Sequence, residues 1–198
     1  MPSGEETRLR AAGYQLIAGV DEAGRGCLAG PVVAAAVILQ PTTVIDGVDD
    51  SKRLSVRTRE QLYEAIRAEA MTVGFGVIQG EIIDAVNILQ ATLLAMRRAI
   101  DALDPPPDIV LIDGDRSPGC PIPHRLIPSG DRLCFSISAA SILAKVARDR
   151  IMQAYDRALP QYGFARHKGY GTREHLLAIA RFGASPLHRR SFRGVRGR

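Results

Sequence analysis

The chain has 198 residues, and 46% of them are hydrophobic, which is enough for one domain with a sizeable core. Its formal net charge is +5 and its pI is near 9.4, so an acidic partner such as nucleic acid suits it. No apolar run reaches membrane-spanning length, so no membrane partner is expected. Three cysteines, an odd number without a C-x-x-C pair, disfavour a disulfide scaffold or a zinc site and indicate a reducing cytoplasm.

The N-terminal residues 1–14 carry several charged side chains and no hydrophobic signal core. We expect them to form a mobile arm. Residues 16–21 follow as a buried strand, because they form a short apolar run that ends in Asp21 and Glu22. Open α/β sheets place their sites at the carboxyl ends of strands, and two adjacent carboxylates there are costly unless a cation such as Mg²⁺ neutralises them. A turn capped by these acids is the simpler alternative.

The next stretch contains Gly24, Arg25 and Gly26. The glycines allow a ligand to approach the backbone, and the arginine offers a positive fork suited to phosphate. Residues 24–29 also match the dinucleotide-binding pattern G-x-G-x-x-A, but that pattern must open a helix. Here Pro31 and the β-branched residues of 32–39 predict a second strand, and the preceding acids would repel a pyrophosphate.

Further along, Ser55 is a suitable N-cap for a helix that ends near residue 70, and Lys52 lies in the loop before it. Without other information, Lys52 is a solvated lysine. Alternating residues predict a third strand at 72–78, and a continuous apolar stripe predicts one long helix at 81–103.

Residues 109–112 form another short apolar strand, which ends in Asp113 and a glycine. If this strand is parallel to the first and beside it, Asp113 lies near Asp21. Taken alone, the Asp-Gly pair indicates a turn. The proline-rich residues 117–128 are expected to be a loop.

The second long helix is predicted at residues 135–158. Ser138, Ser141, Lys145 and Asp149 are three or four residues apart, so they share one of its faces. The alternative role of Asp149 is a surface ion pair with Lys145.

The loop at residues 161–171 carries Tyr170 among glycines and bases, where an aromatic ring can stack on a sugar or plug the edge of a core. Thr172 is expected to cap a short helix that ends near residue 181. The Arg-rich end, including His188, is predicted to be solvated, with residues 193–198 as a basic tail.

Taken together, the motifs of the chain resemble those of bacterial type 2 ribonuclease H (ribonuclease HII), occur in the order of that family, and extend from about residue 15 to residue 192. One departure is Ser138, where the family more often has alanine. The matching segments are residues 21–26 (DEAGRG), 50–52 (DSK), 87–92 (NILQAT), 112–114 (IDG), 136–149 (SISAASILAKVARD) and 167–172 (HKGYGT).

The resemblance implies an α/β, ribonuclease H-like fold: a mixed sheet flanked by helices, with a short C-terminal helical segment, over residues 15–192. It implies Mg²⁺- or Mn²⁺-dependent endonucleolytic cleavage of the RNA strand of RNA–DNA hybrids. It also implies incision on the 5′ side of single ribonucleotides embedded in duplex DNA. The expected partners are these two nucleic acids, and the expected state is a monomer. Two metal ions can activate water and stabilise a leaving 3′ oxygen, so the products should carry 5′-phosphate and 3′-hydroxyl ends.

The resemblance also assigns roles by position. The Gly-Arg-Gly loop would sense the 2′-hydroxyl, the tyrosine would stack on the sugar of the adjoining deoxynucleotide, and two lysines would contact phosphate. The implied metal-binding and catalytic carboxylates are Asp21, Glu22, Asp113 and Asp149. The implied substrate-binding residues are Gly24, Arg25, Gly26, Lys52, Lys145 and Tyr170.

Two alternatives belong to other classes. A non-catalytic nucleic-acid-binding protein would explain the basic tail but not the acids at the strand ends. A nuclease of the same superfamily that acts on DNA alone would cut an all-DNA duplex as well as a hybrid, and the Gly-Arg-Gly loop argues against it. The related type 3 enzymes vary the residue between the two glycines and carry an N-terminal extension, whereas this chain has Arg25 and little room before Leu16.

Overall fold

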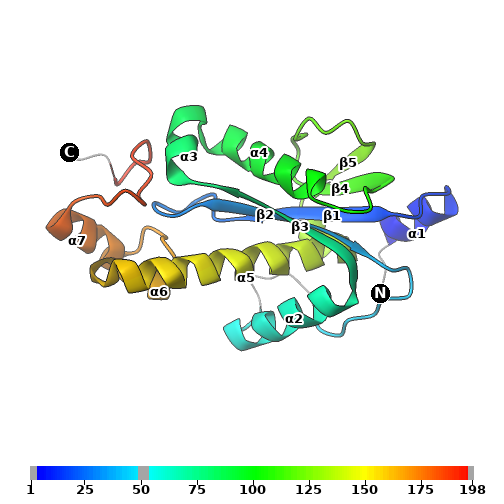
Figure 1. Ribbon diagram of the computed structural model, residues 1–198, viewed down its shortest axis with the longest axis horizontal. Coiled ribbons are helices and arrows are strands. Elements are labelled where there is room, and N and C mark those ends of the chain that lie inside the picture. Colours follow the sequence, from blue (N-terminus) through cyan, green and yellow to red (C-terminus); the bar gives the residue numbers. More distant parts are fainter. Residues whose placement is uncertain (1–3, 49–53, 196–198) are drawn as a thin grey trace.

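The structure, a computed structural model, describes residues 4–48 and 54–195, so Lys52 lies outside the described residues. Its centre is a five-stranded mixed sheet with strand order β3-β2-β1-β4-β5 (Figure 1). This sheet with flanking helices confirms the predicted α/β class. The strands are β1 (Ile17–Ala23), β2 (Val32–Leu39), β3 (Ala70–Ile78), β4 (Ile109–Asp113) and β5 (His124–Ile127).

The central strand, β1, pairs antiparallel with one neighbour and parallel with the other. β2 is antiparallel to both β1 and β3, whereas β1, β4 and β5 run parallel to one another. The register between β1 and β4 pairs Val20 with Ile112. The next residues of these strands are Asp21 and Asp113, so the prediction that the two strands are parallel neighbours is confirmed.

Helices cover both faces of the sheet (Figure 1). On one face, α4 (Ile88–Asp101) packs across β1, β2 and β3, with α3 (Gly80–Val86) at its start. On the other face, α5 (Phe135–Ala158) packs on β1 and β2, and α2 (Val56–Glu69) packs against α5. Gly19 of β1 allows this close approach, because a Cβ there would overlap the backbone of α5.

The prediction of a single helix at residues 81–103 is wrong, because the helix is interrupted at Asn87. Asn87 has a φ of 70°, a left-handed value that ends α3, and its side-chain oxygen accepts a hydrogen bond of 3.1 Å from the backbone N–H of Gln90. Asparagine both tolerates this conformation and caps helices, so one residue ends α3 and starts α4. The apolar stripe keeps its helical spacing across this interruption, so the periodicity of the sequence does not reveal that there are two helices.

At the N-terminus, the predicted mobile arm contains a helix, α1 (Gly4–Ala11). Leu9 of this helix is fully buried in a small core with Ile17 and Leu111. The buried carboxylate of Glu6 accepts a hydrogen bond of 2.8 Å from the backbone N–H of Ser136, at the start of α5. The helix is thus docked on the domain, and the mobility expected of residues 1–14 stays a prediction.

Another difference is β5, which lies inside the segment expected to be a loop. Its four residues, HRLI, show no apolar alternation, and their burial is partial. β5 pairs with β4 at the edge of the sheet. An edge strand of this length buries too little to leave a hydrophobic pattern in the sequence.

The C-terminal region consists of short helices and a returning segment. It contains a 3₁₀ turn at Pro160–Tyr162 and the helices α6 (Phe164–His167) and α7 (Arg173–Phe182), which confirms the expected helical segment. Another 3₁₀ turn, at Gly130–Arg132, lies between β5 and α5. After α7 the chain returns to the β1–β2 connection, where His188 pairs with Ala29 in an antiparallel bridge. His188 and Arg189 are only 2% and 0% exposed, so the prediction of a solvated end is wrong for them.

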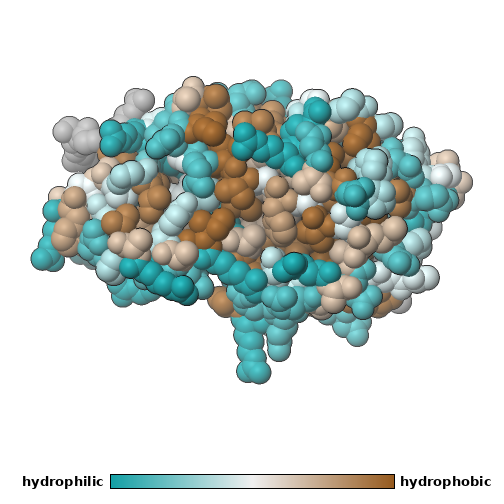
Figure 2. Space-filling model, viewed as in Figure 1, coloured by the Kyte–Doolittle hydropathy of each residue, from teal (hydrophilic) through white to brown (hydrophobic). Residues whose placement is uncertain are grey.

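The surface in Figure 2 intersperses hydrophobic residues among hydrophilic ones. Across the described ranges, no helix has both the length and the apolar character that crossing a membrane requires.

Candidate active site

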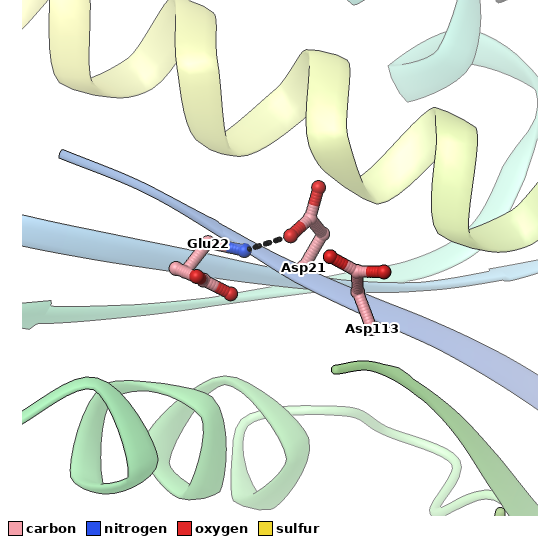
Figure 3. Close-up of side chains that lie close together, drawn as sticks. All are labelled: Asp21, Glu22 and Asp113. Carbon is pink, nitrogen blue, oxygen red and sulfur yellow. Dashed lines mark hydrogen bonds between the residues drawn. The ribbon is translucent and has the colours of Figure 1, made fainter. Parts of the chain in front are cut away.

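Three carboxylates meet where β1 and β4 end side by side. Asp21 and Glu22 come from β1 and Asp113 is the last residue of β4. One oxygen from each side chain lies within 4.8 Å of the others (Figure 3). Among the described residues, this is the one group of three or more histidine, cysteine or acidic side chains close enough to share a metal ion.

The pleat of the strands distributes these side chains. Asp21 follows Gly19 on the face covered by α5, while Val20 belongs to the core beneath α4. Figure 3 shows Asp21 and Asp113 between the strands and α5, with the Glu22 side chain on the side of β1 that faces away from α5. The Glu22 side chain therefore reaches the group from the other side of β1.

Backbone amides hold two of the carboxylates in place. Asp21 accepts a hydrogen bond of 2.6 Å from the N–H of Glu22, and Asp113 accepts one of 2.7 Å from the N–H of Gly130. Arg25 forms an ion pair of 3.3 Å with Glu22. These contacts orient the three carboxylates.

The electrostatics of the group favour a cation. Burial is the main reason that the pKa of Asp21 lies well above its usual value, and repulsion from Glu22 and Asp113 raises it further. Burial also raises the pKa of Glu22, against the opposing effect of Arg25. Clustered hard oxygens with raised pKa values fit a divalent cation such as Mg²⁺ or Mn²⁺, because its charge would remove the repulsion. Asp21, Glu22 and Asp113 are the residues that could hold it.

The acids form one wall of an open pocket of about 210 Å³. The Gly24–Gly26 loop forms another wall, and Ser141 and Lys145 of α5 complete it together with Tyr170. Gly24 has a φ of +98°, and a Cβ at this position would overlap the Arg148 side chain, so the loop requires glycine here.

The fourth predicted carboxylate lies differently. Asp149 is buried on α5, and its Oδ1 forms an ion pair of 2.8 Å with Nζ of Lys145, one turn earlier. Asp149 is not a member of the three-carboxylate group. The structure therefore shows the alternative contact that the sequence allowed, and the metal-binding role of Asp149 stays a prediction.

Tyr170 is 44% exposed at the rim of the pocket, and Nζ of Lys145 lies 5.8 Å from its ring centre. Behind it, the Nδ1–H of His175 donates to the carbonyl of Tyr170 at 2.9 Å. A carbonyl only accepts, so Nε2 of a neutral His175 must accept the 3.0 Å bond from Nε2–H of His188. His188 in turn accepts from the backbone N–H of Ser185 at 3.0 Å.

Sequence reasoning missed this buried histidine relay and the two fully buried arginines, Arg148 and Arg189. Each guanidinium donates to three backbone carbonyls near the pocket. Ser141 was expected only to share a face of α5 with Lys145, and it also lines the pocket. Nothing in the local sequence separates these residues from ordinary surface histidines and arginines.

Comparison with known proteins agrees with the geometry. The family model described as "Ribonuclease HII" matches residues 18–195. The chain belongs to the ribonuclease HII family. Ribonuclease HII of Syntrophotalea carbinolica is 54% identical over 96% of this chain and 91% of its own length. Ribonuclease HII of Pelobacter propionicus is 56% identical over 96% of this chain and 87% of its own length.

Solved structures extend the similarity. Ribonuclease H2 from Pyrococcus horikoshii has a TM-score of 0.76 at 25% identity, covering 91% of this chain and 95% of its own. Bst-RNase HIII, solved in complex with Mn²⁺, has a TM-score of 0.77 at 19% identity, covering 97% of this chain and 71% of its own. The fold is thus that of ribonuclease H-like enzymes. As a ribonuclease HII, the protein is a metal-dependent endonuclease that acts on RNA–DNA hybrids.

Proposed function

We propose that this ribonuclease HII also incises duplex DNA on the 5′ side of single embedded ribonucleotides, leaving 5′-phosphate and 3′-hydroxyl ends. The observation that carries the proposal is that one pocket joins the three carboxylates to the Gly24–Gly26 loop and Tyr170. A metal site beside a backbone loop and an aromatic ring suits recognition of one sugar rather than of a base sequence.

In this proposal Asp21, Glu22 and Asp113 hold Mg²⁺ or Mn²⁺, and Asp149 joins them when substrate is bound. Two such ions would activate a water molecule and stabilise the leaving 3′ oxygen. Support comes from the oxygen donors within 4.8 Å of one another. For Asp149 the support is only its position on α5, next to Lys145.

The substrate contacts follow from the walls of the pocket. The loop of Gly24, Arg25 and Gly26 would sense the 2′-hydroxyl, because a Cβ at Gly26 would meet no atom within 4 Å and a sugar has room to approach. Tyr170 would stack on the neighbouring deoxyribose. Lys145 would contact phosphate, and Lys52 stays a second candidate for that role.

Compartment and assembly complete the proposal. All three cysteines, Cys27, Cys120 and Cys134, are free and buried, which suits the cytoplasm. The acids, the loop and the tyrosine all come from one chain, which suits a monomer.

The test uses a labelled DNA duplex with one ribonucleotide, beside the same duplex made wholly of DNA, in Mg²⁺ and in EDTA. We expect a single metal-dependent cut 5′ of the ribonucleotide and none in the control. Cleavage of the all-DNA duplex would refute the proposed specificity. Salt-sensitive binding without cleavage of this duplex or of a long hybrid, in Mg²⁺ or Mn²⁺, would instead indicate a binding protein.

A further inference from the structure

Arg189 lies behind the Gly24–Gly26 loop and is fully buried. Its guanidinium donates from Nη2 to the carbonyl of Gly24 at 2.8 Å and from Nη1 to the carbonyl of Arg25 at 2.9 Å. Its Nε donates to the carbonyl of Gly30 at 3.0 Å. The planar fork of arginine can hold several acceptors at fixed angles, which a lysine ammonium cannot do.

The backbone of Arg189 is fixed as firmly as its side chain. Its N–H donates to the carbonyl of Leu28 at 2.8 Å, and the N–H of Gly30 donates to Leu187 at 2.8 Å. These bonds flank the bridge between Ala29 and His188, so the C-terminal segment pairs directly with the chain that follows the loop.

Beyond Arg189, a carboxylate anchors the same segment. Asp84 of α3 accepts hydrogen bonds from the backbone N–H groups of Arg190 at 2.8 Å and Ser191 at 2.9 Å. The guanidinium of Arg189 also lies 5.1 Å from the centre of the Phe192 ring. Arg189 is therefore held on three sides and can act as a rigid support.

The charge of Arg189 is directed at carbonyl groups. In the part of the chain that the structure describes, no ion pair joins Arg189 to a carboxylate, and Asp84 bonds instead to the backbone N–H groups of Arg190 and Ser191. Burial lowers the pKa of Arg189 to about 10, so the group stays charged at neutral pH. A buried cation costs free energy unless its donors are used, and here the carbonyls of Gly24, Arg25 and Gly30 accept from them.

We propose that Arg189 is a positioning residue for recognition of the 2′-hydroxyl, because it holds the Gly24 and Arg25 carbonyls and so sets the shape of the loop. In a planar trans peptide the C=O and the following N–H point in opposite directions. Holding these two carbonyls therefore directs the N–H groups of Arg25 and Gly26 away from Arg189. This inference rests on the proposed function, in which the loop senses the ribose.

The test measures discrimination directly. Fluorescence anisotropy in EDTA gives the Kd for a labelled duplex with one ribonucleotide and for the all-DNA duplex, and the ratio of the two reports recognition of the 2′-hydroxyl. For Arg189→Lys, which keeps the charge but loses the fork, we expect this ratio to fall by about tenfold, as expected when a recognition group is displaced. In Mg²⁺, kcat/KM on the single-ribonucleotide duplex should fall with it.

The control is Ile100→Ala, which removes a buried side chain of α4 and lowers stability without touching the loop. At a temperature where all variants are folded, it should keep the wild-type ratio. An unchanged ratio in folded Arg189→Lys would overturn the inference, and so would an equal fall in Ile100→Ala.

If Arg189→Lys does not fold, the same ratio of Kd values is measured for Phe192→Leu. This variant removes the ring beside the Arg189 guanidinium and keeps an apolar side chain. A lower ratio in that variant supports the inference, and a wild-type ratio overturns it. If the wild-type protein itself shows neither preference nor cleavage, the proposed function fails and the inference falls with it. The wild-type measurement thus separates the two failures.

Discussion

Replacing Asp21 by asparagine should abolish cleavage and yet stabilise the metal-free protein. The change removes one of three carboxylates whose oxygens lie within 4.8 Å of one another. Two full charges at that distance, with an effective dielectric constant of about 20, repel by about 3 kcal/mol. Partial protonation of Asp21 reduces this, so we expect the free energy of unfolding to rise by about 1–3 kcal/mol. Asparagine can still accept the hydrogen bond from the N–H of Glu22.

The sign of the pH dependence follows from the raised pKa of Asp21. The folded protein binds a proton there more tightly than the unfolded chain does. Without metal, wild-type stability should therefore decrease as the pH rises through this raised pKa, and Asp21→Asn should lack that decrease. The gain in the variant should be largest at pH values above the raised pKa of Asp21, measured in EDTA.

The assay is urea denaturation in EDTA, with cleavage of an RNA–DNA hybrid in Mg²⁺ measured alongside. Asp108→Asn is a matched control with the opposite sign, because Asp108 accepts bonds of 2.8 Å from the N–H groups of Gln15 and Leu16. Those bonds lower the pKa of Asp108, so its replacement should destabilise the protein and leave cleavage intact. A loss of stability in Asp21→Asn would refute the argument from repulsion, and retained cleavage would remove Asp21 from the catalytic group.

Three further predictions concern other parts of the chain. Tyr170→Ala should lose activity mainly on the single-ribonucleotide duplex, and an unchanged rate there would remove Tyr170 from the site. Burial lowers the pKa of His188 to about 4 from 6.5, so stability should be lost as the pH falls from 6.5 towards 4, by up to about 3 kcal/mol. His188→Gln should weaken this loss in urea denaturation at several pH values, and an identical pH profile would contradict it. Leu9→Ala should lower the free energy of unfolding by about 2–5 kcal/mol, because Leu9 is fully buried. A decrease of less than about 0.5 kcal/mol would show that α1 is not docked on the domain.

The elements with strong local signals were predictable from the sequence. β1, β2 and β4 are apolar runs bounded by turn residues, and α5 carries a long helical pattern. The pairing of Asp21 with Asp113 needed one further assumption, that β1 and β4 are parallel neighbours, and the register bears it out.

What the sequence did not reveal depends on tertiary contacts. β5 and α1 are short and partly polar, and they exist because neighbouring elements complete them. Arg189 belongs to a run of basic residues that is indistinguishable in composition from a solvated tail, and only the fold shows its guanidinium among backbone carbonyls. Local patterns report which face of an element is apolar, and they do not report which distant carbonyl a long side chain will reach.

The support of the Gly24–Gly26 loop has a consequence for synthesis on the ribosome. The carbonyl of Gly24 and the guanidinium that holds it are 165 positions apart in the chain. Translation proceeds from the N-terminus, so the three acids of β1 and β4 are all made well before Arg189 emerges. The metal-binding carboxylates can therefore assemble earlier than the loop beside them reaches its final shape. A chain that stops short of Arg189 would carry the acids of a nuclease without the support of its loop.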